Sequence, residues 1–322
     1  MVKLKSLCQA CLDNKSWLNW STRQTTERAF EYFSLAVGNL TIDRISSLHI
    51  GALKKWLHQG RSAASVNMYI RAIRAVFNWA VEQELLEYNP FSGVKLFKTP
   101  RKHKKRYNND EFQKVMESCK TTIWRARILV GKTTGMRRGA VLNLTIDDID
   151  FVNGVIHVQP KRETKTTWWW MPKDKERRPV PLVDEVAVLF RELIRCSPNK
   201  PYLLLTDRVY RNNMRLKKAG ILSDRIRRCP YENFNRDFRR ILNRAGVKAT
   251  FHDLRRTFAT EMVNEVNPAD LMKLMGLSDM STLVTYYLVY DESTCRRAGQ
   301  YASALLKQGV SPESRYPKRK AM

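Results

Sequence analysis

The 322-residue sequence contains no apolar run near the roughly 18 residues that a membrane-spanning helix requires. Its N-terminus, MVKLKSLCQACLDNKSW, has neither the apolar core nor the small-residue cleavage site of an export signal. No internal repeat is visible, and low-complexity tracts are confined to basic segments. We therefore expect a soluble chain that is located in the cytoplasm.

Cysteine is sparse and has no regular pattern. The six cysteines lack framework spacing, which predicts reduced thiols in a cytosol-like compartment instead of a disulfide scaffold. Cys8 and Cys11 form the one CxxC pair, and no second cysteine or histidine pair stands at zinc-ligand spacing. We expect two half-exposed thiols at this pair, and neither a metal ion nor a cofactor in the protein.

Acidic residues are few compared with basic ones. The chain has 31 Asp and Glu against 58 Lys and Arg, a formal net charge of +27 and a pI near 10.1. Apolar residues make up 43% of the chain, which is enough to fill hydrophobic cores and excludes a disordered chain. The length predicts two domains, or three, and the charge predicts a polyanionic partner.

Residues 21–90 have the pattern of helices throughout. Ser21 is the expected N-cap of the first helix, and a second helical stretch covers Ile42 to His58. The clearest helix runs from Ser65 to about Glu84, where apolar residues recur at steps of three and four on one face. The pattern predicts a small all-helical domain that ends near residue 96.

A basic segment, KLFKTPRKHKKR (Lys95 to Arg106), follows this domain. It holds seven Lys or Arg and little to bury, so it is expected to be an extended, solvated connector. Such a run can be a mere linker, but between two basic domains we favour one that follows a phosphate backbone. We place the linker at residues 97–108. The candidate DNA-binding residues are Arg71, Arg74, Lys98, Arg101, Lys102, Lys104, Lys105 and Arg106.

Residues 109–322 are predicted to form a mixed α+β domain with a C-terminal tail. Helices alternate there with three short strands, expected at Val155–Pro160, Thr166–Pro172 and Arg177–Leu182. The stretch Asp207 to Cys229 is basic and poorly patterned, and we treat it as an insertion.

The middle strand contains three consecutive tryptophans. Alternate side chains of a strand face opposite sides, so Trp168 and Trp170 would share one face and Trp169 the other. One face is expected to belong to the core. The other would pack against DNA or a neighbouring protomer, and the sequence does not decide between these.

Two segments hold side chains suited to phosphate chemistry. In FHDLRRTFATEMV, His252 and Arg255 are three residues apart and lie together on a helix. An arginine keeps its charge and presents a planar fork of donors, whereas a histidine exchanges a proton near neutral pH. In GKTTGMRRGAVLNL, Arg137 and Arg138 stand where a helix begins, and one of them can join Arg255 on the same phosphate. Taken alone, all of these also fit surface residues of a basic protein.

These segments resemble the tyrosine recombinase (phage integrase) family, from about residue 15 to residue 300. TGMRRG resembles the motif of its first catalytic arginine, which corresponds to Arg137, and HDLRRTFAT resembles its His-x-x-Arg motif, which gives His252 and Arg255. LMGLSDMSTLVTYY resembles the motif in which tyrosine follows glycine after ten residues, so Gly276 points to Tyr286. The implied fold is mostly α with a small β-sheet, with a helical core-binding domain, a basic linker and a catalytic domain.

The family also has a catalytic lysine in a hairpin turn before a strand of the type R-x-V-P-L. Here PKDKERRPVPL offers Lys173, whose spacing fits better, and Lys175 as the alternate, with Lys165 in the preceding turn as a distant third. Tyr287 and Tyr290 compete with Tyr286 for the nucleophile, and the glycine spacing favours Tyr286.

The resemblance implies a site-specific recombinase or integrase of a mobile element that acts on double-stranded DNA. Arg137 and Arg255 would neutralise the phosphate while Tyr286 attacks it. Lys173 would protonate the leaving 5′-oxygen and His252 would assist proton transfer. The product is a 3′-phosphotyrosyl link, which needs neither a metal ion nor a nucleotide. A homo-tetramer on two DNA sites is expected.

Two positions depart from the family's pattern. Leu277 stands where the family has His or Trp, and Ala140 stands where it usually has an acidic residue. Loss of one hydrogen-bond donor to a developing oxyanion costs about two to three powers of ten in rate. An alternative is therefore a weakened or inactive member that serves as a DNA-binding module. A third hypothesis is a monomeric nicking-closing enzyme similar to type IB topoisomerases.

Overall fold

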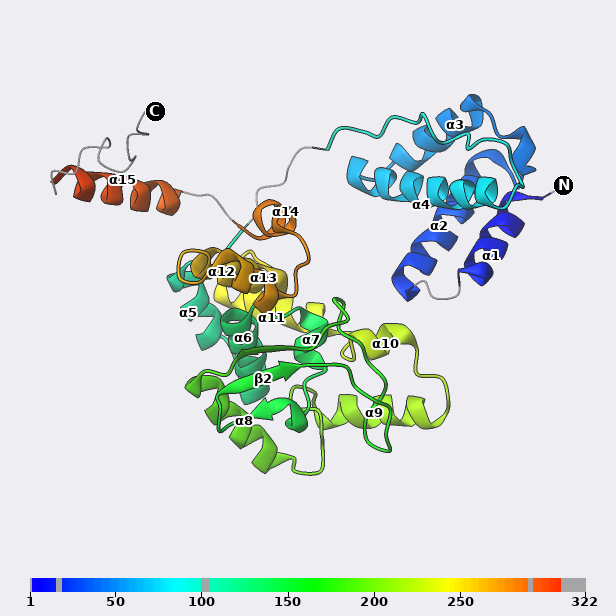
Figure 1. The fold of residues 1–322 in the computed structure, drawn as a ribbon. Helices are drawn as coiled ribbons and strands as arrows, with labels where there is room; N and C mark the ends of the chain where they lie inside the picture. The colour runs from blue at the N-terminus through cyan, green and yellow to red at the C-terminus, as the bar shows by residue number, and fades with distance from the viewer. Residues whose placement is uncertain (1, 16–18, 100–104, 289–291, 308–322) are drawn as a thin grey trace, which may run out of the picture. The chain divides into compact units, whose positions relative to one another are not determined.

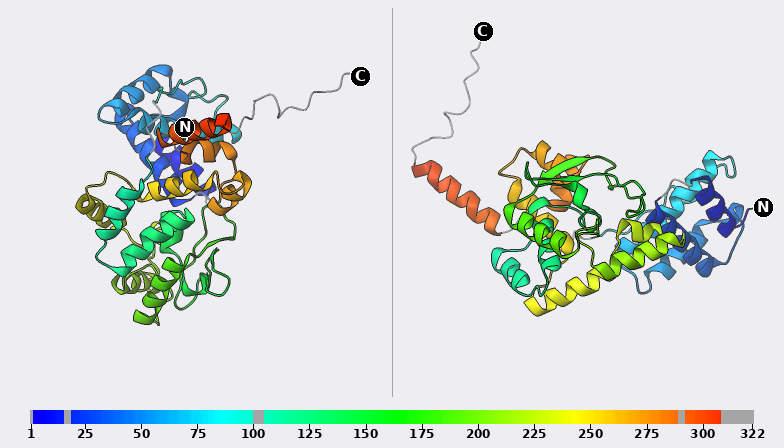
Figure 2. Two further views of the ribbon diagram at one scale, coloured as in Figure 1. Left: turned by 90° about the vertical axis from the view of Figure 1, so that its left-hand side faces the viewer. Right: turned by 90° about the horizontal axis from the view of Figure 1, so that it is seen from below.

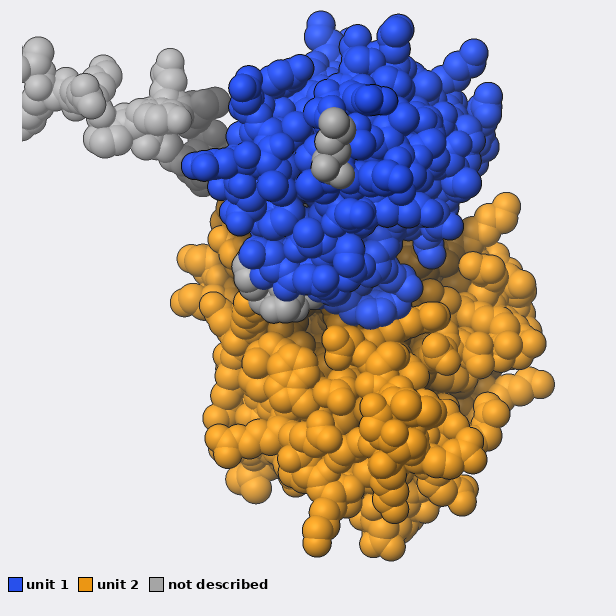
Figure 3. Space-filling model, turned by 90° about the vertical axis from the view of Figure 1, so that its right-hand side faces the viewer, with its two compact units in different colours: residues 1–103 blue, residues 104–322 orange. Residues whose placement is uncertain are grey.

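The computed structural model describes residues 2–15, 19–99, 105–288 and 292–307. The chain divides into two compact units, residues 1–103 and 104–322 (Figure 3). This division falls within the basic segment that follows residue 94. In the described ranges, no helix combines the length and the apolar content that a bilayer crossing requires.

The first unit is a bundle of helices around an aromatic core (Figure 1). Phe77 of its longest helix packs against Phe30 and Phe91, and Phe33 meets Phe91 edge to face. The elements are α1 (Leu4–Asn14), α2 (Trp20–Val37), a 3₁₀ turn (Ile42–Arg44), α3 (Ser47–His58) and α4 (Ala63–Glu82).

Two predictions for this unit were wrong. The N-cap of α2 is Asn19, whose side chain accepts a hydrogen bond from the Thr22 amide at 3.1 Å, and not Ser21. Cys8 and Cys11 are not half-exposed, because helix α1, which the sequence did not reveal, turns both thiols into the core. Burial raises the pKa of the Cys8 thiol to about 12, so it stays protonated and unreactive at neutral pH.

The apolar face expected for α4 is confirmed. Val66, Ile70, Ile73 and Phe77 are all buried. The helix starts at Ala63, two residues earlier than expected, because Ser62 caps it. The Ser62 hydroxyl accepts a hydrogen bond from the Ser65 amide.

The basic segment is less solvated than expected at its ends. The Phe97 backbone exchanges two hydrogen bonds of 2.9 Å with the Asn67 side chain of α4, and its ring stacks on His58. Tyr107 is buried in the second unit, where its amide donates to the Thr257 hydroxyl at 2.9 Å. Each end is therefore held by the unit nearest to it in sequence, because it supplies an aromatic ring for burial.

The second unit combines helices with a small antiparallel sheet (Figures 1 and 2). The strand order is β1-β2-β3, and Ile156 pairs with Val180. Its strands are β1 (Ile149–Asp150), β2 (Val155–Val158) and β3 (Arg178–Pro181). Its helices are α5 (Asn109–Glu117), α6 (Thr122–Thr134), α7 (Arg138–Leu142), α8 (Asp184–Cys196), α9 (Asp207–Lys218), α10 (Asp224–Arg228), α11 (Phe234–Ala245), α12 (Phe251–Met262), α13 (Pro268–Met275), α14 (Met280–Thr282) and α15 (Glu292–Lys307). Short turns lie at Ile146–Asp148 (η2) and Leu283–Tyr287 (η3), the latter a π-helical turn.

The prediction of a strand at Thr166–Pro172 was wrong, because only an isolated bridge joins Trp170 to Lys161. The alternation of its side chains is nevertheless confirmed. Trp168 and Trp170 are buried, whereas Trp169 is 48% exposed. The Trp168 ring stacks on Tyr202 with centroids 4.0 Å apart. Aromatic burial therefore fixes this segment without a strand ladder.

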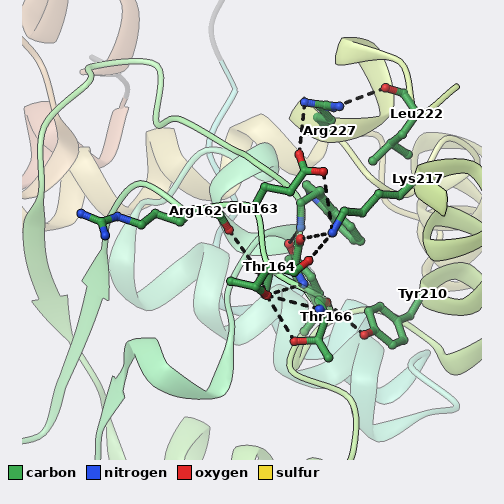
Figure 4. Close-up of polar contacts among 11 residues, drawn as sticks. Arg162, Glu163, Thr164, Thr166, Tyr210, Lys217, Leu222 and Arg227 are labelled. Atoms are coloured by element: carbon green, nitrogen blue, oxygen red, sulfur yellow. Dashed lines mark hydrogen bonds and ion pairs between the residues drawn. The ribbon is translucent and has the colours of Figure 1, made fainter. Parts of the chain in front are cut away.

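The stretch Asp207–Cys229 is not an irregular insertion, because it forms α9 and α10. These helices hold the loop that follows β2 (Figure 4). Lys217 of α9 donates to the carbonyl oxygens of Thr164 and Thr167, and the Tyr210 hydroxyl donates to the Thr166 carbonyl at 3.0 Å. The sequence did not predict these helices, because their apolar residues, such as Val209, Met214 and Ile226, are interspersed with many arginines and lysines.

Trp168→Ala is expected to lower the free energy of unfolding of the second unit by about 3–5 kcal/mol, because it removes a fully buried ring. Trp169→Ala is the matched control and is expected to cost about 1 kcal/mol or less. Denaturant titration of both variants measures this difference. Equal losses would contradict the placement of the two side chains.

Candidate active site

Three guanidinium groups meet at the C-terminal end of α13. They come from distant parts of the second unit: the residue before α7, strand β3 and helix α12. Each donates one hydrogen bond to one of three consecutive carbonyl groups: Arg178 to Leu274 (3.1 Å), Arg255 to Met275 (2.6 Å) and Arg137 to Gly276 (3.0 Å). The last carbonyls of a helix lack partners within it and carry the negative end of its dipole, so they are suited to hold cations together.

Local structure explains how two of these arginines arrive there. Helix α6 ends at Gly135, which takes the left-handed conformation (φ 61°) and turns the chain so that Arg137 precedes α7. Arg255 also donates a second hydrogen bond, at 2.7 Å, to the Gly135 carbonyl. The TGMRRG and His-x-x-Arg segments are therefore joined directly, as their proposed roles require.

Arg255 is almost fully buried, with 1% of its surface exposed. Burial lowers its pKa to about 10, while the nearby Tyr287 opposes this and Arg137 adds to it. The group still carries its charge at neutral pH. Its guanidinium lies over the Tyr287 ring, 4.7 Å from the ring centroid.

A cleft of about 860 Å³ opens beside this cluster. Arg255 lies behind its wall, since it is not among the lining residues, so its charge acts on the cleft from within the fold. The side chains in the cleft that can bind an anion or exchange protons with it include Arg137, Arg138, Lys173, Arg178, Arg228, His252, Arg256 and Tyr287. Such a set is suited to a phosphate group.

His252 lies in the first turn of α12 and faces the cleft. Its pKa is lowered to about 4, first by partial removal of the imidazole from water and then by the positive charges of Arg256 and Arg255. The imidazole is therefore neutral at physiological pH and can accept a proton or a hydrogen bond.

The three candidate tyrosines differ in what the structure describes. The backbone of Tyr286 lies in the π-helical turn η3, but its side chain and all of Tyr290 lie outside the described part of the chain. Tyr287 is buried at the cleft wall, with its ring 5.5 Å from the His252 ring. The next residue after the motif tyrosine thus packs against two of the expected catalytic side chains.

Of the three candidate lysines, Lys173 lines the cleft. Lys175, two residues on, is exposed and takes a left-handed backbone conformation (φ 60°) in the same turn. Lys165 lies on the loop held by α9 and lines a different groove, together with Tyr210 and Lys218. The choice of Lys173 as the catalytic lysine stays a prediction.

Residues 105–293 match the model of the phage integrase family, and residues 3–105 match that of the phage integrase SAM-like domain. The chain belongs to the phage integrase family.

Three relatives of this integrase chain illustrate the family. A XerC-like tyrosine recombinase of Caldanaerobacter subterraneus subsp. tengcongensis is 26% identical over 254 residues, which are 72% of this chain and 64% of that protein. A XerA tyrosine recombinase of Saccharolobus solfataricus is 28% identical, over 71% of this chain and 65% of that protein. The transposase from transposon Tn916 of Enterococcus faecalis is 24% identical, over 82% of this chain and 69% of that protein. The chain thus spans less than two thirds of the length of the first two relatives.

Solved integrase structures share the fold. A lambda integrase dimer bound to a COC′ core site aligns with a TM-score of 0.67 at 15% identity, over 89% of this chain and 77% of that one. The Tn1549 transposon integrase in complex with transposon right end DNA aligns with a TM-score of 0.68 at 19% identity, over 94% of this chain and 100% of that one. The expected fold class is confirmed: mostly helical with a small sheet, an N-terminal helical domain and a C-terminal catalytic domain of the integrase type.

The two departures from the integrase pattern have visible consequences. Leu277 packs against the apolar cluster of Phe258, Leu271 and Met275, so it offers no donor to the cleft. Ala140 is buried. An acidic group nevertheless stands beside the first arginine, because Asp174 lies 3.6 Å from it.

Sequence reasoning missed Arg178 and Asp174. Both line the cleft and form an ion pair with each other. Burial lowers the pKa of Arg178, and Asp174 opposes this shift. The signal was present, since Arg178 is the arginine of the R-x-V-P-L pattern, but the pattern was used only to place the strand and the lysine.

The candidate DNA-binding residues have diverse environments. Arg71 and Lys98 are exposed, whereas Arg74 is half-buried and donates to the Val94 carbonyl at 2.5 Å. Lys105 is paired with Glu111 at 2.6 Å. Arg106 is half-buried, and Arg101, Lys102 and Lys104 lie outside the described residues.

In the DNA-free protein, His252 is expected to titrate with a midpoint near pH 4, below the usual value of about 6.5. A bound phosphate backbone offsets the neighbouring guanidinium charges, so duplex DNA is expected to raise this midpoint. NMR of the imidazole nitrogens measures it, with the signal assigned by its loss in His252→Gln. A midpoint at or above 6.5 without DNA would contradict the described electrostatics.

Proposed function

We propose that this chain is a site-specific DNA recombinase or integrase. In this proposal it breaks and rejoins double-stranded DNA through a 3′-phosphotyrosyl intermediate, without a metal ion or a nucleotide. The observation that carries the proposal is the convergence of Arg137, Arg178 and Arg255 at one cleft that also contains His252. Family membership supports it, as do the DNA-bound structures of lambda and Tn1549 integrases.

The arginines can neutralise the negative charge that hinders cleavage of a phosphodiester. The anionic oxygens of a phosphodiester repel a nucleophile, and negative charge increases further in the transition state. Arg137 reaches the cleft and can bind these oxygens directly. Arg255 adds permanent positive charge from behind the wall, where water screens it little. Neither contribution requires a metal ion.

Tyr286 is the proposed nucleophile, because it follows Gly276 at the family's spacing. Its phenolate oxygen would form a bond to phosphorus while the bond from phosphorus to the 5′-oxygen breaks. The covalent link preserves the phosphodiester energy, so a 5′-hydroxyl from another duplex can reverse the step. Tyr287 is the alternative nucleophile, and its contacts with His252 and Arg255 support it.

The proton transfers are assigned to Lys173 and His252. Lys173 stands in the cleft, where its ammonium can protonate the departing 5′-oxygen, and Lys175 is the alternate from the same turn. A neutral His252 can take the proton of the attacking phenol. Both groups lie within the second unit, on β3's preceding turn and on α12.

The DNA partner is expected to extend over both units. We propose that exposed Arg71 and Lys98 of the first unit, together with Arg101, Lys102 and Lys104 of the basic segment, bind phosphates outside the cleavage site. In the same proposal, residues 1–96 and 109–322 are the core-binding and catalytic domains. The chain would act as a homo-tetramer on two DNA sites, in the cytoplasm with the nucleoid.

A second candidate function is a DNA-binding module with a weakened catalytic centre. Leu277 favours it, because this apolar, half-buried side chain stands where other family members place a hydrogen-bond donor. A monomeric nicking-closing enzyme would share the chemistry but not the tetramer.

The proposal is tested with a nicked suicide duplex whose binding site has been selected from random sequences. We expect a denaturant-resistant protein–DNA adduct that is absent in Tyr286→Phe and present in Tyr287→Phe. Persistence of the adduct in Tyr286→Phe would contradict the assignment of the nucleophile. Good DNA binding without any adduct would indicate the binding module, and relaxation of plasmid by a strict monomer would indicate the nicking-closing enzyme.

A further inference from the structure

The turn before β3 places a carboxylate inside the cleft. Asp174 is only 11% exposed, and its Oδ2 atom pairs with the Arg178 guanidinium. The same oxygen lies 3.6 Å from an Nη atom of Arg137. The two arginines thus each hold a carbonyl of the α13 terminus with one nitrogen and face the same carboxylate with another.

This carboxylate resembles a phosphodiester in charge and in hydrogen-bonding geometry. Both groups carry one negative charge shared between two oxygens, and both suit the planar fork of a guanidinium. The place that Asp174 fills is the one where Arg137 would bind a DNA phosphate. The two anions cannot occupy it together, because like charges at this distance repel each other.

The contact is incomplete, which suits a group that must leave. The second oxygen of Asp174, Oδ1, is buried and has no hydrogen-bond partner in the described part of the chain. A buried acceptor without a donor is unfavourable. A phosphate that reaches both arginines and keeps its other oxygens in the open cleft avoids this penalty.

The surroundings couple Asp174 to the reacting segments. Lys173 and Lys175 flank it, and the Lys175 amide closes the turn by a 3.0 Å hydrogen bond to the Pro172 carbonyl. On its other side, the carboxylate lies so close to the backbone of Gly276 that a Cβ there would collide with it. Departure of Asp174 would therefore move the neighbouring Lys173 and open space beside Gly276, where the segment that leads to Tyr286 begins.

We propose that Arg178 is a further phosphate-binding residue, paired with Arg137, and that Asp174 closes this site until a DNA phosphate displaces it. The proposal rests on the proposed function, because it concerns the same site. Glu176, in the same turn, is exposed and makes no ion pair among the described residues, so it provides a matched control. Arg177 is likewise an exposed neighbour of Arg178.

The test uses inorganic phosphate as the probe, titrated into the full chain at constant ionic strength and followed by the His252 NMR signal. Asp174→Asn preserves the shape and removes the charge, and it is expected to bind phosphate about tenfold more tightly than the unaltered protein. Glu176→Gln is expected to change the affinity by less than about twofold, since an exposed charge is screened. In the Asp174→Asn background, Arg178→Lys is expected to remove the gain, whereas Arg177→Lys preserves it.

Phosphate affinity in Asp174→Asn that equals or falls below that of the unaltered protein would overturn the proposal. If Asp174→Asn and Asp174→Ala both fail to fold, the carboxylate is needed to hold the arginines together and the proposal also fails. The suicide-duplex assay separates this failure from that of the proposed function. If the adduct forms but Asp174→Asn does not bind phosphate more tightly, only the proposed displacement of Asp174 is wrong. If Asp174→Asn binds phosphate more tightly but no adduct forms, only the proposed recombinase chemistry is wrong.

Discussion

Everything at the cleft depends on three guanidinium groups that share the C-terminal end of one helix. Arg137, Arg178 and Arg255 come from separate segments, and their mutual repulsion would drive them apart in a site that lacked acceptors. The last carbonyls of α13 provide those acceptors, and the helix dipole adds to the attraction. Because the chain continues from this point to η3, the element that gathers the positive charge also positions the segment of the proposed nucleophile.

The same concentration of charge contributes to the protonation state of its neighbours. Partial removal from water and then the nearby guanidinium charges lower the pKa of His252, so its imidazole is neutral at physiological pH in the DNA-free protein. The cleft thus contains fixed cations for the phosphate and one neutral group for the proton, a division of roles that suits phosphoryl transfer without a metal ion. Asp174 provides the counter-charge in the absence of DNA. The turn that carries Lys173, the candidate catalytic lysine, also carries Asp174, the group that we propose a DNA phosphate displaces.

Local patterns predicted what depends on local periodicity and on sequence motifs. The apolar face of α4, the strands β2 and β3, and the junction of the Arg137 segment with Arg255 all agree with the structure. The sequence could not reveal contacts between distant segments. Asp174 and Arg178 are only four residues apart, and Arg178 belongs to the R-x-V-P-L pattern, but their meeting with Arg137 and the end of α13 arises only when the chain folds. Likewise, Asn19 and Ser21 are both good N-caps, and only packing selects between them.

The most direct test of the central claim is a crystal structure of the protein on a duplex that contains its cleavage site. The account predicts that the scissile phosphate lies within hydrogen-bond distance of Arg137 and Arg178, that Asp174 has left this position, and that Arg255 still donates to the carbonyl of Met275. A scissile phosphate bound elsewhere, with Asp174 still between the two arginines, would contradict it.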